Sequence, residues 1–225
     1  YFEAALSLQP DYVEALNNMG AVRLQLAVLP QALAVFKRAM QLQPTFATAA
    51  VNAAMALHQL GEHLQSRKTL DSVLQQMPDD PGVHWVRAVA ELESVYQSRS
   101  HLDASRQRYA DRLQDVLGRV DRASIAQRAS MASLLNSMSP YLLPYQGRDD
   151  VELQRIAAKI TQVVGGATPP PERTERQSRN AELRIGIVSG FFYDHSNWKI
   201  PIQGWLQALI RRYEVHAYYT GRRED

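Results

Sequence analysis

The chain contains no cysteine among its 225 residues. Disulfides and thiolate metal sites are therefore excluded, and the composition suits a reducing cytoplasm. The formal net charge is only +2, which disfavours a nucleic-acid or membrane binder that relies on bulk electrostatics. The sequence also lacks any run of about 18 apolar residues, so no membrane-spanning helix is expected. We expect a cytoplasmic protein with no metal and with neither nucleic acid nor membrane as partner.

Two glycine-rich phosphate-binding patterns are also missing. There is no G-x-G-x-x-G fingerprint and no Walker-type loop, so neither a nicotinamide cofactor nor a P-loop is indicated. Apolar residues make up 45% of the chain, which is enough to build a core. The sequence begins at Tyr1 in the middle of a repeating pattern, so we expect it to be part of a longer chain.

A 34-residue repeat dominates the first part of the chain. Pro10, Pro44 and Pro78 each lie 34 residues apart, and each proline is expected to end a helix. Each unit has a small residue early in its first helix: Gly20, Ala54 and Ala88. In two units a second small residue begins the second helix: Ala32 and Ser66. Small residues at these positions allow the two helices to cross closely. The length and pattern resemble the tetratricopeptide repeat, a stacked α-helical solenoid. We place the repeats at 1–97, with a divergent last helix over about 81–97.

Asn18 and Asn52 occupy the same position of two successive first helices. The first helix of each pair lines the concave side of such a solenoid. Two amides one repeat apart are able to hydrogen-bond the backbone of an extended peptide, although solvated polar residues on an exposed face would give the same pattern. The next equivalent position is Val86, where an amide ladder would stop.

A helical bridge over 98–164 and a linker over 165–181 are expected next. An apolar face with helical spacing runs through residues 109–120, and interleaved aspartates make the arginines around it an ion-paired surface rather than a nucleic-acid site. Further helices are predicted from about 123 to 138 and from Val151 to Val164. Glycine, three prolines and a charged run then mark the clearest boundary in the chain.

The segment 182–225 reads as the start of an α/β domain. LRIGIV is predicted to be a buried parallel strand, KIPIQGWLQALIRRY a helix and EVHAYYTG a second strand, which together make a βαβ unit. Asp194 and His195 fall in the loop after the first strand, where ligands bind in open α/β sheets. A histidine there is able to handle a proton near neutrality, or to make only a structural hydrogen bond.

Three segments together resemble the repeat-containing O-linked N-acetylglucosamine transferases of glycosyltransferase family 41. They are the 34-residue repeats, PYLLPYQGRDDVELQ in the bridge, and LRIGIVSGFFYDHSNWKIPIQGWL with YEVHAYYTG. The resemblance implies a mainly α fold, with a solenoid and bridge followed by the first βαβ unit of a Rossmann-like (GT-B) lobe. It also implies transfer of a sugar, N-acetylglucosamine, from a UDP-sugar to Ser or Thr of proteins, without a metal or other cofactor.

The resemblance places His195 at the family's active-site histidine and Asn18 and Asn52 at its asparagine ladder. The partners implied are a polypeptide acceptor in the repeat groove and the UDP-sugar, with Asp194 beside the histidine. Ser196 stands where better-known members have a proline, and Lys199 stands where they have a second histidine. Lys199 would either approach a phosphate of the donor or be a surface lysine at a helix start.

Two other hypotheses remain open. The chain would be an interaction scaffold without catalysis, or the start of a Rossmann-type lobe from another nucleotide-using class. Since the sequence stops after two predicted strands, residues 1–225 alone are expected to have no transferase activity, because the lobe that grips UDP in this family is not included.

Overall fold

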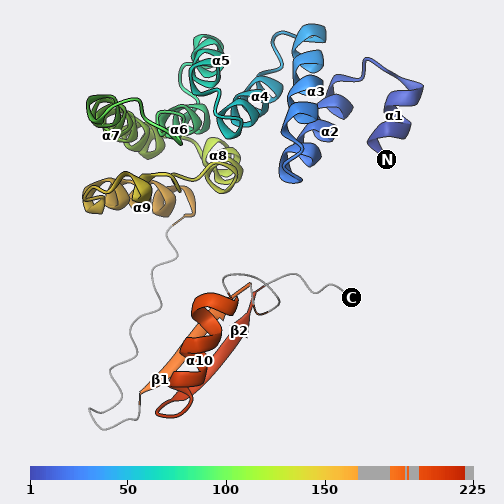
Figure 1. Cartoon of the computed structure of the whole chain (residues 1–225). Coiled ribbons are helices and arrows are strands. Elements are labelled where there is room, and N and C mark those ends of the chain that lie inside the picture. The colour runs from blue at the N-terminus through green and yellow to red at the C-terminus, as the bar shows by residue number, and fades with distance from the viewer. Residues whose placement is uncertain (167–182, 191, 193–197, 221–225) are drawn as a thin grey trace. The chain divides into compact units, whose positions relative to one another are not determined.

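The structure, a computed structural model, describes residues 1–166, 183–190, 192 and 198–220. The chain divides into two units, Tyr1–Thr168 and Pro169–Asp225, and each is described by itself. The first unit is helical, and the second contains a small sheet (Figure 1).

Stacked helix pairs build the first unit. In the repeats, α2 packs on α3, α4 on α5 and α6 on α7, and each pair packs on the next. This arrangement is a tetratricopeptide-type solenoid, so the predicted mainly α fold is confirmed. Its helices are α1 (Phe2–Leu8), α2 (Val13–Gln25), α3 (Leu29–Leu42), α4 (Ala47–Gln59), α5 (His63–Gln76), α6 (Pro81–Val89), α7 (Arg99–Arg122), α8 (Ile125–Ser137) and α9 (Val151–Val164).

Small residues set the close approach of paired helices, as the sequence predicts. A Cβ atom on Gly20 of α2 would lie 2.5 Å from Cε1 of Phe36 on α3, so only glycine fits there. In the next pair, Ser66 of α5 donates a 2.7 Å hydrogen bond to the carbonyl oxygen of Ala54 on α4. Both side chains are fully buried.

The last repeat helix is shorter than predicted, since α6 ends at Val89 and not near residue 97. The backbone N–H of Glu93 donates to the hydroxyl oxygen of Tyr96, and that of Ser94 donates to Nε2 of His63. Side chains thus replace the carbonyl oxygens that would accept these hydrogen bonds if the helix continued.

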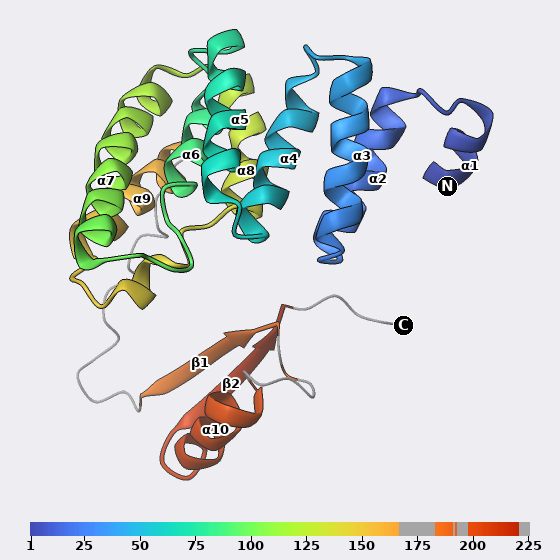
Figure 2. The ribbon, with the colours of Figure 1, turned by 45° about the horizontal axis from the view of Figure 1, so that its top comes forward.

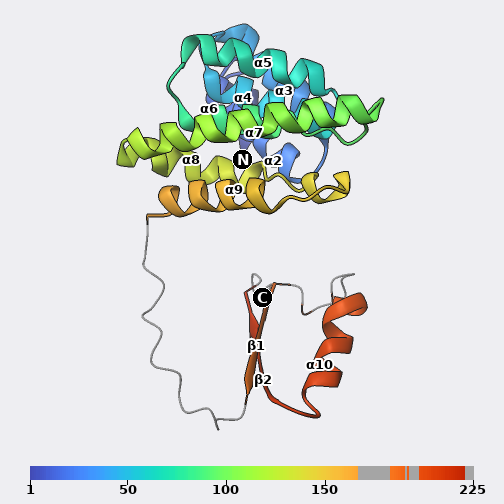
Figure 3. The ribbon, with the colours of Figure 1, turned by 90° about the vertical axis from the view of Figure 1, so that its left-hand side faces the viewer.

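The bridge continues the stacking of the repeats. Helix α8 packs on α6, and α9 packs on α7, beside which it runs in Figure 3. Tyr109, Leu113, Val116 and Val120 of α7 are buried in a single apolar core that extends from α4 to α9. The repeats and the bridge are therefore one packed body.

The second unit contains a parallel two-stranded sheet. Strands β1 (Arg184–Ser189) and β2 (Glu214–Tyr219) pair in register from Arg184 opposite Glu214. A π-helical turn (Trp198–Ile202) and α10 (Gln203–Leu209) lie between them in sequence, which makes the predicted βαβ unit. Helix α10 lies on one side of the strands (Figure 3), and Val188 on β1 remains 66% exposed.

Within the described ranges, the structure contains no helix with the length and apolar character needed to cross a membrane.

Candidate peptide-binding groove

Two asparagines join the first helices of successive repeats. Asn52 of α4 is half-buried, and its Nδ2 donates to Oδ1 of Asn17 on α2 at 2.9 Å. Asn17 is itself buried, and its Nδ2 donates a long, 3.4 Å hydrogen bond to Oδ1 of the exposed Asn18. The three amides therefore form one chain of hydrogen bonds that crosses between the helices.

Asn52 does not bond to Asn18, the residue that the repeat spacing selects, but to its neighbour Asn17. A spacing of 34 residues pairs Asn52 with Asn18, whereas the contact spans 35 residues and joins Asn17. The signal in the sequence was the pair of adjacent asparagines in LNNMG, of which the first makes the contact. Val86, at the next position, is fully buried in the core, so the series of amides ends at Asn52.

Three adjoining hollows follow one face of α4 and are lined on their other side by α8 and the residues after it, and the first hollow is also lined by Ala21, Leu24 and Gln25 of α2. Their volumes are about 520, 200 and 70 Å³. Asn52 lines the first two, while Met55, Gln59 and Ser137 line both the first and the third, so the hollows form one groove. Helix α8 lies behind α4 and α6 in Figure 2.

The lining of this groove is almost free of charge. Asp80 is its one carboxylate among the described residues, and its Oδ1 accepts the N–H of Val83 at 2.9 Å as the N-cap of α6. His58 at the far end is neutral near pH 7, because burial and the nearby His63 and Arg67 lower its pKa to about 4. Such a groove is able to exchange hydrogen bonds with a polypeptide, but apart from Asp80 at one end its lining offers no charge to pair with an acidic or basic side chain.

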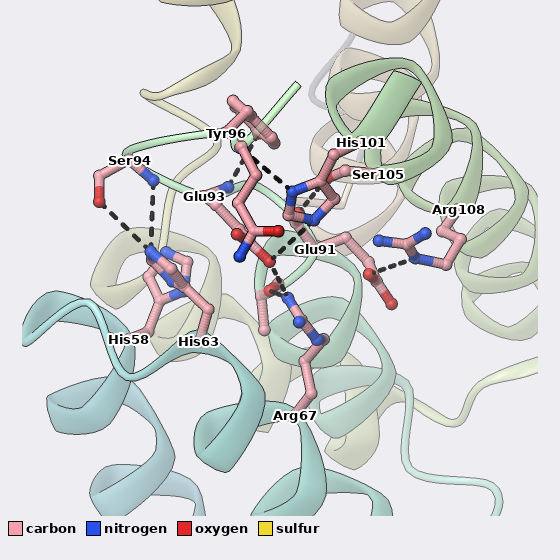
Figure 4. A network of polar contacts seen from close by, with 12 residues as sticks. His58, His63, Arg67, Glu91, Glu93, Ser94, Tyr96, His101, Ser105 and Arg108 are labelled. Atoms are coloured by element: carbon pink, nitrogen blue, oxygen red, sulfur yellow. Dashed lines mark hydrogen bonds and ion pairs between the residues drawn. The ribbon is translucent and has the colours of Figure 1, made fainter. Parts of the chain in front are cut away.

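Behind the groove, two buried imidazoles join the repeats to the loop after α6 (Figure 4). Nε2 of His63 accepts the backbone N–H of Ser94, so the ring proton of neutral His63 is on Nδ1 and points to Nδ1 of His58 at 3.2 Å. Burial lowers the pKa of His63, against the raising effect of the Glu93 carboxylate. The pair is a structural contact between neutral rings.

The same network of polar contacts also contains the buried carboxylate of Glu91 (Figure 4). Glu91 is 1% exposed and accepts hydrogen bonds from three arginines: Arg87 at 2.6 Å, Arg108 at 2.8 Å and Arg112 at 3.0 Å. Burial raises the pKa of Glu91, but the hydrogen bonds from Arg108 and Arg87 outweigh it and hold the pKa below its usual value. Nearby, Arg67 pairs with Glu93 at 2.7 Å. Glu91 thereby fixes α7 to α6.

The predicted loop residues Asp194 and His195 lie outside the described residues. Lys199 is exposed in the π-helical turn before α10. The structure therefore brings Asn52 and Asn18 together through Asn17, and the roles of the other site residues remain predictions. In the described part of the chain, no group of three or more His, Cys, Asp or Glu side chains is placed to hold a metal ion.

Comparison with known proteins agrees with the repeats. A family model for the tetratricopeptide repeat matches residues 29–92, while no curated protein matches the chain. The structure of a mutant Thermobaculum terrenum O-GlcNAc transferase is similar to this chain over 100% of its length and 34% of the transferase, with a TM-score of 0.52 and 21% identity. The structure of MamA from Desulfovibrio magneticus RS-1 is similar over 73% of this chain and 81% of MamA, with a TM-score of 0.46 and 15% identity.

The chain thus spans about a third of the length of that transferase. At such identities the likeness establishes the fold alone. Solenoids of this class in general have an extended concave surface.

Proposed function

We propose that this chain is the amino-terminal part of a glycosyltransferase that moves a sugar, N-acetylglucosamine, from a UDP-sugar to Ser or Thr of proteins. The solenoid guides the polypeptide acceptor, and the βαβ unit begins the lobe that carries out the transfer. His195 would act at the reacting end, as proton handler or as a positioner of the acceptor and the phosphate. Asp194 and Lys199 would lie beside the donor.

The observation that carries this proposal is the order of parts within one chain. A solenoid with an amide-lined groove precedes a parallel βαβ unit in the sequence, and the likeness to the transferase structure covers the full length of this chain. Fold similarity alone does not assign a reaction, so the groove supplies the chemical part of the argument. Asn52 and its uncharged surroundings suit a ligand that is recognised through its backbone.

A donor panel tests the proposal on the full-length protein. Purified protein is incubated with UDP-N-acetylglucosamine, UDP-glucose or UDP-galactose and a mixture of Ser/Thr-containing peptides, and sugar addition is measured by mass spectrometry. We expect transfer from UDP-N-acetylglucosamine, and His195→Ala to lower kcat by about a hundredfold or more, the usual contribution of a proton-transfer group. His216→Ala is the matched control, because His216 lies exposed on β2 and hydrogen-bonds Glu214.

The outcomes are distinct. Absence of transfer from every donor would overturn the glycosyltransferase assignment, and full activity of His195→Ala would overturn the site. Residues 1–225 alone are expected to be inactive, so turnover by this piece would contradict our view of what the reaction requires.

The second candidate is a scaffold that binds proteins and catalyses nothing. The groove beside Asn52 supports a binding scaffold as well as it supports an enzyme, since an uncharged hollow there suits peptide binding with or without sugar transfer. Peptide binding by the full-length protein without sugar transfer from any donor would select this reading.

A further inference from the structure

We propose that α8 is the second wall of the acceptor groove and that the groove selects extended polypeptide segments with no charged side chain over about five residues. This inference rests on the proposed acceptor-guiding role and adds the chemistry of the segment that is guided. The occupant is a polypeptide held through its backbone from two sides.

The first wall is a row along α4 in which three of the four side chains are polar. Thr48, Asn52, Met55 and Gln59 line the hollows and recur at helical spacing on one face of the helix. Thr48 and Gln59 are exposed. Asn52 bonds to Asn17 through its Nδ2, so its side-chain oxygen Oδ1 remains an acceptor for a ligand. These groups offer both donors and acceptors to a peptide backbone.

The second wall is a row of exposed hydroxyls on α8. Ser133 donates its proton to the carbonyl oxygen of Ser130 at 3.0 Å, and Ser137 donates to that of Ser133 at 2.9 Å. Both hydroxyls line the groove. Because their protons are engaged, they act toward a ligand as acceptors, which suits the N–H groups of an extended chain.

The close packing of α8 on the repeats keeps this wall in place. Met131 of α8 is fully buried, and a Cβ atom on Gly82 of α6 would lie 2.8 Å from Cδ1 of Leu134. The wall therefore rests on the same core as the repeats, and the groove between α4 and α8 is a preformed feature of the first unit.

Length and charge define the segment. Thr48 to Gln59 spans about 16 Å of helix at 1.5 Å per residue, which matches about five residues of extended chain at 3.3 Å each. A charged side chain in this stretch would give up hydration and meet no opposite charge, except for a cation beside Asp80 at one end. Uncharged segments are therefore favoured over acidic and basic ones.

Selection from a random heptapeptide library on the immobilised full-length protein tests the specificity. We expect bound peptides to lack Asp, Glu, Lys and Arg over four to five successive positions, and a selected peptide to lose about tenfold or more in affinity when a central residue becomes Glu. Enrichment of charged sequences, or of no sequence at all, would overturn the proposal.

Variants of α8 test the wall. Ser133→Ala and Ser137→Ala should each weaken the selected peptide about three- to tenfold, the loss of one hydrogen bond, and alanine preserves the helix. Ser7→Ala is the matched control, because Ser7 is exposed on α1 and donates to the carbonyl oxygen of Ala4 at 2.8 Å in the same way. Ser133→Asp should instead shift selection toward lysine-containing peptides.

Each failure has a separate meaning. Normal binding by both α8 alanine variants would remove the second wall and leave acceptor guidance by α4 intact. Binding of uncharged peptides without sugar transfer from any donor would remove the proposed transferase function and leave the groove.

Discussion

Asn52 on α4 donates its side-chain amide to Oδ1 of Asn17 on α2 at 2.9 Å, across 35 residues of sequence. This hydrogen bond joins the first helices of two successive repeats on the surface that lines the groove. The side-chain amide of Asn52 therefore links the stacked repeats and is also a polar group in the lining of the groove.

Removal of the buried partner should destabilise the solenoid. Asn17→Ala leaves the amide of Asn52 without its acceptor, and we expect the free energy of unfolding to fall by about 1–2 kcal/mol. Asn18→Ala is the matched control, since Asn18 is exposed, and its effect should stay within about 0.5 kcal/mol. Urea denaturation followed by circular dichroism measures both, and equal losses for the two variants would contradict the assignment.

Glu91 should be far more important to stability than a surface carboxylate of similar geometry. Glu91→Gln leaves three arginines facing a neutral side chain at a site that is 1% exposed, and we expect a loss of about 3 kcal/mol or more. Thermal unfolding in dilute buffer measures the change.

Asp11→Asn is the control for that prediction. Asp11 pairs with Arg38 at 2.6 Å, but the two side chains are 60% and 52% exposed. Water already screens such a pair, so the variant should lose less than about 1 kcal/mol. A loss for Glu91→Gln as small as that of Asp11→Asn would mean that the buried cluster does not hold α7 to α6.

The repeat geometry was predictable because it depends on local rules. The prolines at 34-residue spacing and the need for a small residue at Gly20 follow from backbone hydrogen bonding and helix contact alone, and the helix pairs form where those rules place them. The parallel βαβ unit likewise follows from the β-branched run LRIGIV and the run EVHAYYTG, which flank a helical pattern.

Contacts between distant segments could not be read from the sequence. The choice of Asn17 over Asn18 depends on the axial offset of stacked helices, which a repeat period does not encode. The early end of α6 depends on Tyr96 and His63, which accept backbone N–H groups from the following loop. The position of Ser133 and Ser137 opposite α4 depends on how the bridge packs on the repeats.

Stability should decline in mild acid because of His58. Its pKa is lowered from 6.5 to about 4 by burial, His63 and Arg67, so between these pH values the unfolded chain binds a proton that the folded chain does not. This contribution is fully present above pH 6.5 and falls as the pH drops toward 4, by about 3 kcal/mol in total.

Urea denaturation at a series of pH values between 4.5 and 7 measures this dependence. His58→Gln removes the titrating ring, so its stability should change less over the same range, with the remaining slope due in part to His63, whose pKa is also lowered. An unchanged pH dependence in the variant would show that His58 is not the group responsible.

Two tyrosines on neighbouring segments should differ in their effect on stability when their hydroxyls are removed. Of the buried side-chain polar atoms in the described residues, the hydroxyl of Tyr109 alone has no hydrogen-bond partner, and burial raises its pKa. Tyr109→Phe removes an unsatisfied group and should leave stability unchanged or raise it by about 1 kcal/mol.

The hydroxyl of Tyr96, by contrast, accepts the backbone N–H of Glu93 at 2.9 Å and Nε2 of Gln146 at 2.7 Å. Tyr96→Phe leaves both donors without an acceptor and should cost about 1–3 kcal/mol. The two variants differ from the parent by one oxygen atom each, so thermal unfolding of both isolates the hydrogen bonds from the packing of the ring. If Tyr109→Phe proves the more damaging, the hydroxyl of Tyr109 must bind a partner such as an internal water, and the loop after α6 must be held by contacts other than those of Tyr96.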